Sequence, residues 1–256
     1  MKTSYFEKNL YLAIALLTFS GSTHSIEVVR AFIFSDNTQY SVDISLFDNH
    51  APVTVNNFLG NIDTHKYDNI FFNRNIRGAI IQAGGYSFDP TLNDGSFSYD
   101  GNDQFNGGLQ PTPGVTTIQN EFNKSNIRGT LSMAKYSGDT DSNSNEWFIN
   151  ISDNTALDSA SEGFTVFGEI LDNGIEVIDQ ITKTPTYDLS ADIDYENAFL
   201  DVPLNNFTAD SDTSNIGNDN LIKISFSRQF NLTEILDFGD AVPGTNIQKN
   251  IIITNN

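Results

Sequence analysis

Cysteine is absent from this sequence of 256 residues, which excludes disulfides, thiolate nucleophiles and cysteine-ligated metal centres. Histidine is scarce too: the three residues, His24, His50 and His65, form no cluster with the spacing of a metal site. The sequence also has no G-x-S-x-G elbow and no phosphate loop. Hydrolysis by a triad or a metal therefore has no support, and we expect neither a metal nor another cofactor.

Positive charge is scarce as well. The 13 Lys and Arg residues are outnumbered by 33 Asp and Glu, so the formal net charge at pH 7 is −20. Binding to nucleic acid needs clustered cations against the phosphates, and this composition excludes nucleic acid as a partner. An anionic membrane surface is disfavoured for the same reason. The most direct effect of the charge is solubility.

Long apolar runs are absent except near the N-terminus. Lys2 and Lys8 precede an apolar run from Leu10 to Phe19, and small and polar residues follow up to Ser25. The run is too short for a permanent transmembrane helix, so the pattern predicts a secretory signal peptide over residues 1–25. The alternative is an N-terminal membrane anchor. After cleavage we expect a periplasmic or secreted bacterial protein that does not associate with a membrane.

Short apolar segments alternate with long polar loops in the rest of the chain. Residues 40–46 alternate apolar and polar side chains, which is typical of a half-buried antiparallel strand. Further strands are predicted at residues 26–34, 80–82, 130–134, 147–151, 164–170 and 221–227. Helical spacing predicts helices at residues 51–62 and 172–181, with Asp48 or Asn49 as a candidate cap for the first. Many short strands and two helices favour a closed antiparallel β-barrel capped by the helices.

The final segment, residues 230–256, contains two strand-like pieces around a Pro-Gly turn. Two strands alone are marginally stable in water, so these either pack on the barrel or begin a truncated domain. The segment resembles the opening of immunoglobulin-like repeats in secreted bacterial proteins.

Four stretches carry the most specific pattern in the sequence. They read FFNRNIRGAIIQAGG from Phe71, NEFNKSNIRGTLSMAK from Asn120, NSNEWFINISDNTALD from Asn143 and GFTVFGEILDNGIEVIDQI from Gly163. In residue types, order and spacing they resemble the motifs of the cyclophilins, a family of peptidyl-prolyl cis-trans isomerases. The resemblance is strongest to exported bacterial members. The resemblance covers about residues 26–229. It implies a mainly β fold, an eight-stranded closed antiparallel barrel capped by two α-helices.

The resemblance gives a role to Arg74, a permanent cation inside the apolar stretch from Phe71 to Tyr86. Prolyl isomerisation makes and breaks no covalent bond, so it needs a donor that binds the twisted imide nitrogen rather than a nucleophile or a metal. By resemblance, Arg74 is this catalytic donor, and Gln82 holds the substrate carbonyl or orients Arg74. The alternatives are a surface ion pair for Arg74 and a plain surface position for Gln82.

The resemblance also implies a substrate-binding set. Four apolar residues match positions in or just behind the proline pocket, one aromatic residue matches its rim, and one residue pairs its backbone with the substrate. With two polar neighbours the set is Ile80, Met133, Phe148 and Leu157, then Phe164, Ala134, Asn73 and Glu146. For Met133 and Phe148 the alternative is plain core packing.

The sequence departs from the family pattern at five of these or neighbouring positions. Asn73 replaces a histidine, Trp147 a phenylalanine, and Ala79 and Ala156 each replace an aromatic residue of the pocket. Each lost aromatic contact weakens binding by about 1.5–3 kcal/mol, so we expect poorer substrate affinity. Glu146 replaces a glutamine, and its carboxylate either holds Arg74, diverts its donors from the substrate, or points to water.

Two functions remain open at this point. The first is a peptidyl-prolyl cis-trans isomerase that assists folding of exported proteins, with proline-containing polypeptides as partners. The second is a degenerate cyclophilin-fold module that binds proline-containing segments without useful catalysis. The presence of Arg74 favours the enzyme, because the group that acts on the imide nitrogen is retained.

Overall fold

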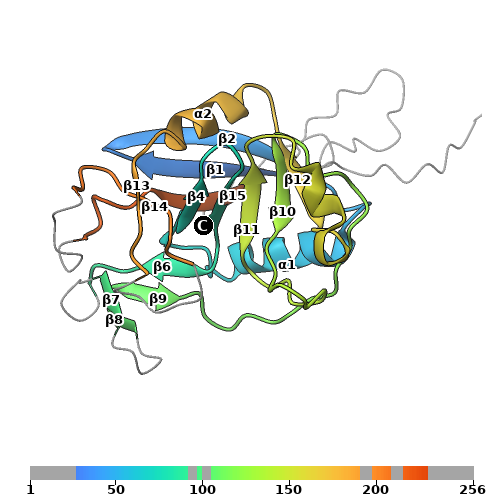
Figure 1. Ribbon diagram of the computed structural model, residues 1–256, viewed down its shortest axis with the longest axis horizontal. Helices are drawn as coiled ribbons and strands as arrows, with labels where there is room; N and C mark the ends of the chain where they lie inside the picture. The colour runs from blue at the N-terminus through green and yellow to red at the C-terminus, as the bar shows by residue number, and fades with distance from the viewer. Residues whose placement is uncertain (1–26, 92–96, 100–104, 191–197, 209–215, 230–256) are drawn as a thin grey trace, which may run out of the picture.

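The structure is a computed structural model that describes residues 27–91, 97–99, 105–190, 198–208 and 216–229. The predicted signal peptide, residues 1–25, and the strand-like segment, residues 230–256, lie outside the described residues. Figure 1 shows a curled sheet with α1 (Pro52–Asp63) and α2 (Gly174–Ile181) on opposite sides of it. The predicted fold class, mainly β with two α-helices, is confirmed. No described helix has the length and apolar character that crossing a bilayer requires.

Most strands belong to one antiparallel sheet of eleven strands, in the order β4-β5-β11-β10-β12-β2-β1-β15-β3-β6-β9. They are β1 (Val28–Ser35), β2 (Thr38–Leu46), β3 (Ile70–Phe71), β4 (Arg74–Ile76), β5 (Ile80–Ala83), β6 (Tyr86–Phe88), β9 (Leu109–Pro111), β10 (Thr130–Met133), β11 (Trp147–Asn150), β12 (Val166–Ile170) and β15 (Lys223–Gln229). Two small sheets pair β7 (Phe97–Tyr99) with β8 (Phe105–Gly107) and β13 (Thr186–Tyr187) with β14 (Val202–Pro203). Two 3-10 helices, η1 (Thr155–Asp158) and η2 (Ala160–Glu162), precede β12.

The segment of residues 70–76 closes the sheet into a barrel. Its first part, β3, pairs with β15, and the N–H of Phe72 donates to the carbonyl of Ile222 at 3.0 Å. The N–H of Asn73 then donates to the carbonyl of Gln82 at 3.1 Å, and β4 continues along β5. The sheet has eleven strands rather than the predicted eight. The ring itself has eight when β3 and β4 count as one and β6 and β9, which extend the sheet beyond β3, are left out.

Aromatic rings around Phe58 of α1 form the centre of the barrel core. The centroid of the Phe58 ring lies 5.1 Å from that of Phe167, 5.2 Å from that of Phe226 and 6.3 Å from that of Trp147. Aromatic pairs of this kind contribute about 0.5–1.5 kcal/mol each beyond area burial. Because Trp147 of β11 points into this core, the next residue, Phe148, faces the outer side of the sheet.

The start of α1 is capped by a residue remote in the sequence. The N-cap residue, Ala51, makes no capping hydrogen bond through its side chain. Instead the carboxylate of Glu121 accepts hydrogen bonds from two backbone N–H groups of the first turn and from Thr54 Oγ1, the last at 2.8 Å. The prediction that Asp48 or Asn49 caps the helix is therefore wrong. A carboxylate is well suited to this place, because it satisfies free amides and meets the positive end of the helix dipole.

We expect Glu121→Ala to lower the free energy of unfolding by about 1 kcal/mol, the usual cost of a lost helix cap. Urea denaturation followed by circular dichroism at neutral pH measures the change. Glu169→Ala, at an exposed position of β12, is the control and should leave the midpoint unchanged. Equal midpoints for the parent and Glu121→Ala would contradict a capping role for this carboxylate.

Candidate active site

A groove of about 450 Å³ opens on the outer face of the sheet beside β4, β5 and β11. The side chain of Ile81 on β5 packs in the barrel core, so those of its neighbours Ile80 and Gln82 point the other way and face the groove. Of the ten predicted site residues, eight line this groove: Arg74, Gln82, Ile80, Ala134, Glu146, Phe148, Leu157 and Phe164. The described residues contain no group of three or more His, Asp or Glu residues that could hold a metal ion.

The other two predicted residues, Asn73 and Met133, lie behind the groove wall. Both are fully buried. The side chain of Met133 packs in the barrel core, which is the alternative considered for it above. The Nδ2 of Asn73 donates to the carbonyl of Ala198 at 3.0 Å, so this residue joins the closing segment of the barrel to the chain at the groove's edge.

Arg74 and Gln82 stand opposite each other on neighbouring strands, because the register of β4 and β5 pairs these two residues. Arg74 is half-buried, and its Nε atom is fully buried without a hydrogen-bond partner. The ion pairs found among the described residues involve Arg30, His65, Arg128 and Arg228, and none includes Arg74. The structure thus shows no surface ion pair for Arg74, which instead lines the groove.

Glu146 brings a carboxylate into the same part of the groove. The residue is partly exposed where it lines the groove, but its Oε1 is fully buried and has no hydrogen-bond partner, so this oxygen does not point to water. A Cβ atom added at Gly85 would lie only 2.1 Å from this oxygen, which means that the absence of a side chain at Gly85 makes room for the carboxylate. The backbone carbonyl of Glu146 accepts from the N–H of Ala134 at 2.9 Å and ties the start of β11 to the end of β10.

The surroundings of Glu146 change its acidity. Burial raises the pKa of its carboxyl to about 7, although a side-chain hydrogen bond with Gln82 and the charge of Arg74 act in the opposite direction. The carboxyl therefore exchanges its proton near neutral pH. A titratable group beside the proposed catalytic cation is the main electrostatic feature of this groove.

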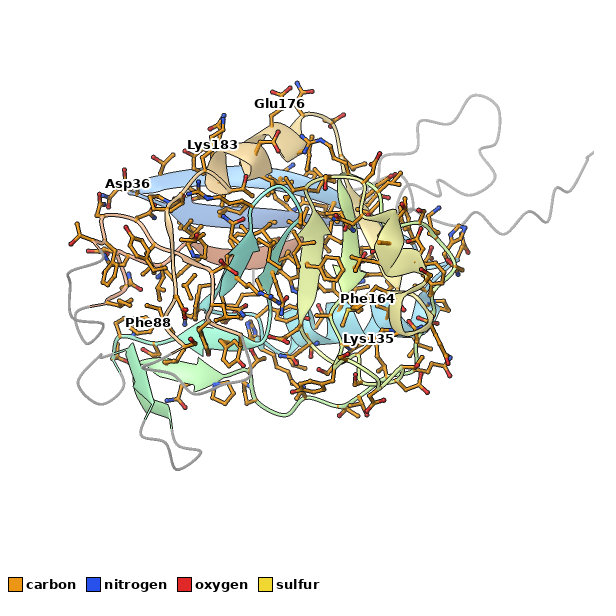
Figure 2. The ribbon with its side chains drawn as sticks, in the orientation of Figure 1. Asp36, Phe88, Lys135, Phe164, Glu176 and Lys183 are labelled. Atoms are coloured by element: carbon orange, nitrogen blue, oxygen red, sulfur yellow. The ribbon has the colours of Figure 1, made fainter. Side chains whose placement is uncertain are left out.

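The apolar end of the groove is built by two aromatic rings and a lysine. Phe148 and Phe164 make an edge-to-face contact at 5.9 Å between centroids. The Nζ of Lys135 lies 5.0 Å from the centroid of Phe164 and donates to the carbonyls of Ser161 and Gly163 at 2.7 and 2.6 Å. Figure 2 shows Lys135 and Phe164 together at this end. The ammonium thus holds the turn that carries the aromatic rim.

A partly buried polar network supports the loop that carries Leu157. One carboxylate oxygen of Asp158 accepts from the N–H and the Nδ2 of Asn126 at 2.8 and 3.0 Å. Although burial alone would raise the pKa of Asp158, hydrogen bonds from Ser125 and Asn126 hold it below the ordinary value. The network fixes η1 against β10 and presents Leu157 to the groove.

Several groove residues escape the sequence analysis. They are Ile76, Gly85, Tyr86, Pro111, Thr112, Val115, Lys135, Tyr136, Ser142, Ser144, Asn145 and Ala198. Ile76 is two residues beyond Arg74 on the same strand, so the alternation of side chains could have placed it in the groove. Lys135 could have been expected there because it directly follows Ala134. Most of the others come from loops, where no periodicity marks a shared surface. Ala79 and Ala156, which replace family aromatics, do not line the groove.

The buried carboxyl of Glu146 should make stability depend on pH. Because its pKa is raised to about 7, the folded protein holds this proton more tightly than the unfolded chain, so its contribution to stability is lost as pH rises from about 4.5 through about 7. We expect Glu146→Gln to gain on the order of 2–3 kcal/mol relative to the parent between about pH 5 and about pH 8. Urea denaturation at both values measures this. A gain that does not change with pH would contradict the argument.

Comparisons with known proteins point in one direction. The sequence model of the family described as "Cyclophilin type peptidyl-prolyl cis-trans isomerase/CLD" matches residues 32–199. Peptidyl-prolyl cis-trans isomerase A of Dickeya dadantii is 32% identical over 150 residues, which cover 57% of this chain and 68% of that protein. Peptidyl-prolyl cis-trans isomerase B of Escherichia coli is 34% identical over 150 residues, covering 56% of this chain and 79% of that protein.

Solved structures agree on the fold. The crystal structure of a cyclophilin type peptidyl-prolyl cis-trans isomerase from Cryptosporidium parvum has a TM-score of 0.52 and 22% identity, covering 81% of this chain and 99% of that one. A structure of the same protein in the presence of the dipeptide Ala-Pro has a TM-score of 0.50 and 23% identity, covering 80% and 99%. The family match and the sequence relatives show that the chain belongs to the cyclophilin-type peptidyl-prolyl cis-trans isomerases.

Proposed function

We propose that this isomerase acts on proline-containing segments of exported polypeptides, with Arg74 as its catalytic residue. The observation that carries the proposal is the Nε–H of Arg74, which is buried in the groove wall and has no acceptor. A buried donor left without a partner costs about 1–3 kcal/mol, and an imide nitrogen entering the groove would remove that cost.

The chemistry needs little more than this donor. Rotation about a peptide bond has a barrier of about 18–20 kcal/mol, because resonance with the carbonyl is lost. At the perpendicular geometry the imide nitrogen recovers its lone pair and becomes a hydrogen-bond acceptor. A guanidinium aimed at that nitrogen therefore binds the twisted form better than either planar form, and each 1.4 kcal/mol or so of this preference gives a tenfold acceleration.

The rest of the groove suits a proline-containing segment. Phe148, Leu157 and Phe164 offer an apolar surface for the pyrrolidine ring at one end of the groove. The N–H of Ala134 is already bonded to a protein carbonyl, so pairing with the substrate backbone would use the carbonyl of Ala134. The related Cryptosporidium parvum structure obtained in the presence of Ala-Pro supports this class of ligand.

A binding module without useful catalysis is the second candidate. The observation in its favour is the pair of alanines, Ala79 and Ala156, at positions where the family carries aromatic residues. Their loss reduces the apolar contact available to substrate. It does not remove the donor, because Arg74 remains in the groove wall with its Nε–H unpaired.

We expect Arg74→Ala to reduce kcat/KM for a blocked Ala-Pro peptide by about a hundredfold or more, because the transition-state contact is lost. Exchange spectroscopy by NMR on the purified chain measures both directions of isomerisation without a coupling enzyme. Arg77→Ala removes an exposed guanidinium three residues away and should retain the parent rate. A rate that survives Arg74→Ala would move the chemistry elsewhere. Peptide binding with no measurable rate in the parent would support the binding module.

Export is proposed from the N-terminal pattern of two lysines and an apolar run over residues 10–19. We expect a bacterial host to deliver the protein to the periplasm or medium with an N-terminus near residue 26. Cell fractionation followed by intact-mass measurement gives both the compartment and the cleavage site. An uncleaved chain in the cytosol would contradict export, and an uncleaved chain in the membrane fraction would favour the anchor.

A further inference from the structure

Three charged residues line the groove. Arg74 comes from β4, Glu146 from the start of β11, and Lys135 from the rim. The charge of Arg74 acts on the carboxyl of Glu146, yet the ion pairs of the described residues include no direct contact between the two. Carboxylate and guanidinium thus come from two residues of one groove wall, and each has a buried polar atom without a hydrogen-bond partner: Glu146 Oε1 and Arg74 Nε.

The position of the carboxylate is built into the fold. Gly85 leaves the space that Glu146 Oε1 occupies, since any Cβ at that residue would collide with it. The side chain of Gln82, the strand partner of Arg74, acts on the same carboxyl and lowers its pKa against the effect of burial. Both polar residues that the proposed reaction uses thus interact with one carboxyl group.

We propose that Glu146 is a positioning residue whose bound proton controls how far Arg74 and Gln82 are available to the substrate. This inference rests on the proposed function of Arg74. The ionised carboxylate attracts the guanidinium and accepts from the amide of Gln82, so both donors are drawn from the substrate. The neutral acid exerts no net charge on Arg74 and releases it to the imide nitrogen. The isomerase is therefore faster when Glu146 is protonated.

The groups around Glu146 differ from it in how they respond near neutral pH. Tyr67 packs from the segment after α1 and donates its hydroxyl to the carbonyl of Asn145 at 2.8 Å; burial raises its pKa, so it stays neutral. Lys135 is held by two carbonyls at the rim. Arg74 is the charged neighbour on β4. Because the pKa of Glu146 is raised to about 7, its proton is exchanged within an ordinary assay range.

The test is the pH dependence of kcat/KM for a blocked Ala-Pro peptide, which has no titrating group of its own. We expect the parent rate to rise about tenfold as the pH falls through about 7. Glu146→Gln should remove this dependence and hold the rate at the upper level of the parent at every pH. Glu176→Gln, an equal charge change at an exposed position of α2 far from the rim residues in Figure 2, should keep the parent profile.

Two results would overturn the proposal. One is a Glu146→Gln variant that retains the parent's pH profile. The other is a flat profile at the lower level, which would mean that the ionised carboxylate assists Arg74. Gly85→Ala provides a second variant, because its methyl group displaces the carboxylate; it should also flatten the profile toward the faster rate.

A spectroscopic readout separates this inference from the proposed function. The NMR signal of the Arg74 Nε–H should shift with a midpoint near pH 7 in the parent and stay constant in Glu146→Gln. An inactive parent that shows this titration would overturn the catalytic role of Arg74 and support its coupling to Glu146. An active parent whose Arg74 signal does not titrate would overturn the coupling and leave catalysis by Arg74 intact.

Discussion

The register between β4 and β5 is the constraint on which the site depends. The segment of residues 70–76 changes partner from β15 to β5, and the bond from Asn73 N–H to Gln82 O, at 3.1 Å, marks the point of change. From there Arg74 faces the groove and Asn75 the interior. Because side chains alternate along a strand, a slip of one residue would turn the guanidinium into the barrel and leave the groove without its cation. Closing the barrel and aiming the donor are therefore one structural event.

The predictable parts of this arrangement are those that follow from the alternation of apolar and polar residues over a few neighbouring positions. Period-2 alternation places residues 40–46 on a strand, and the structure has β2 there. The same rule puts Ile80 and Gln82 on one strand face, and both line the groove. The choice of Arg74 came from a family resemblance rather than from pattern. The local sequence alone shows only that Arg74 is a permanent cation between apolar residues.

The parts that could not be predicted depend on contacts between segments remote in sequence. Glu121 caps α1 from 67 residues away, while two polar residues next to the helix are not used for the purpose. Nothing in the local sequence marks Gly85, and only the fold shows that the carboxylate of Glu146 occupies the space that a side chain at this position would need. The strand count has the same origin, since β6 pairs with β3 and β9 with β6 through tertiary packing rather than propensity, and each has only three residues.

The departures from the family pattern fall into two energetic classes. Under the proposed function, an aromatic wall would contact the proline ring in the planar and the twisted forms alike, so aromatic residues missing at Ala79 and Ala156 would raise KM without lowering kcat. Arg74 differs in the proposed mechanism, because its donor would meet a lone pair that exists only near the perpendicular geometry. Glu146 belongs with Arg74 in this division, because its carboxyl interacts electrostatically with the cation proposed to discriminate between the two forms. Under the proposed function, the aromatic positions therefore bear on affinity, whereas Arg74 and its titratable neighbour Glu146 bear on rate.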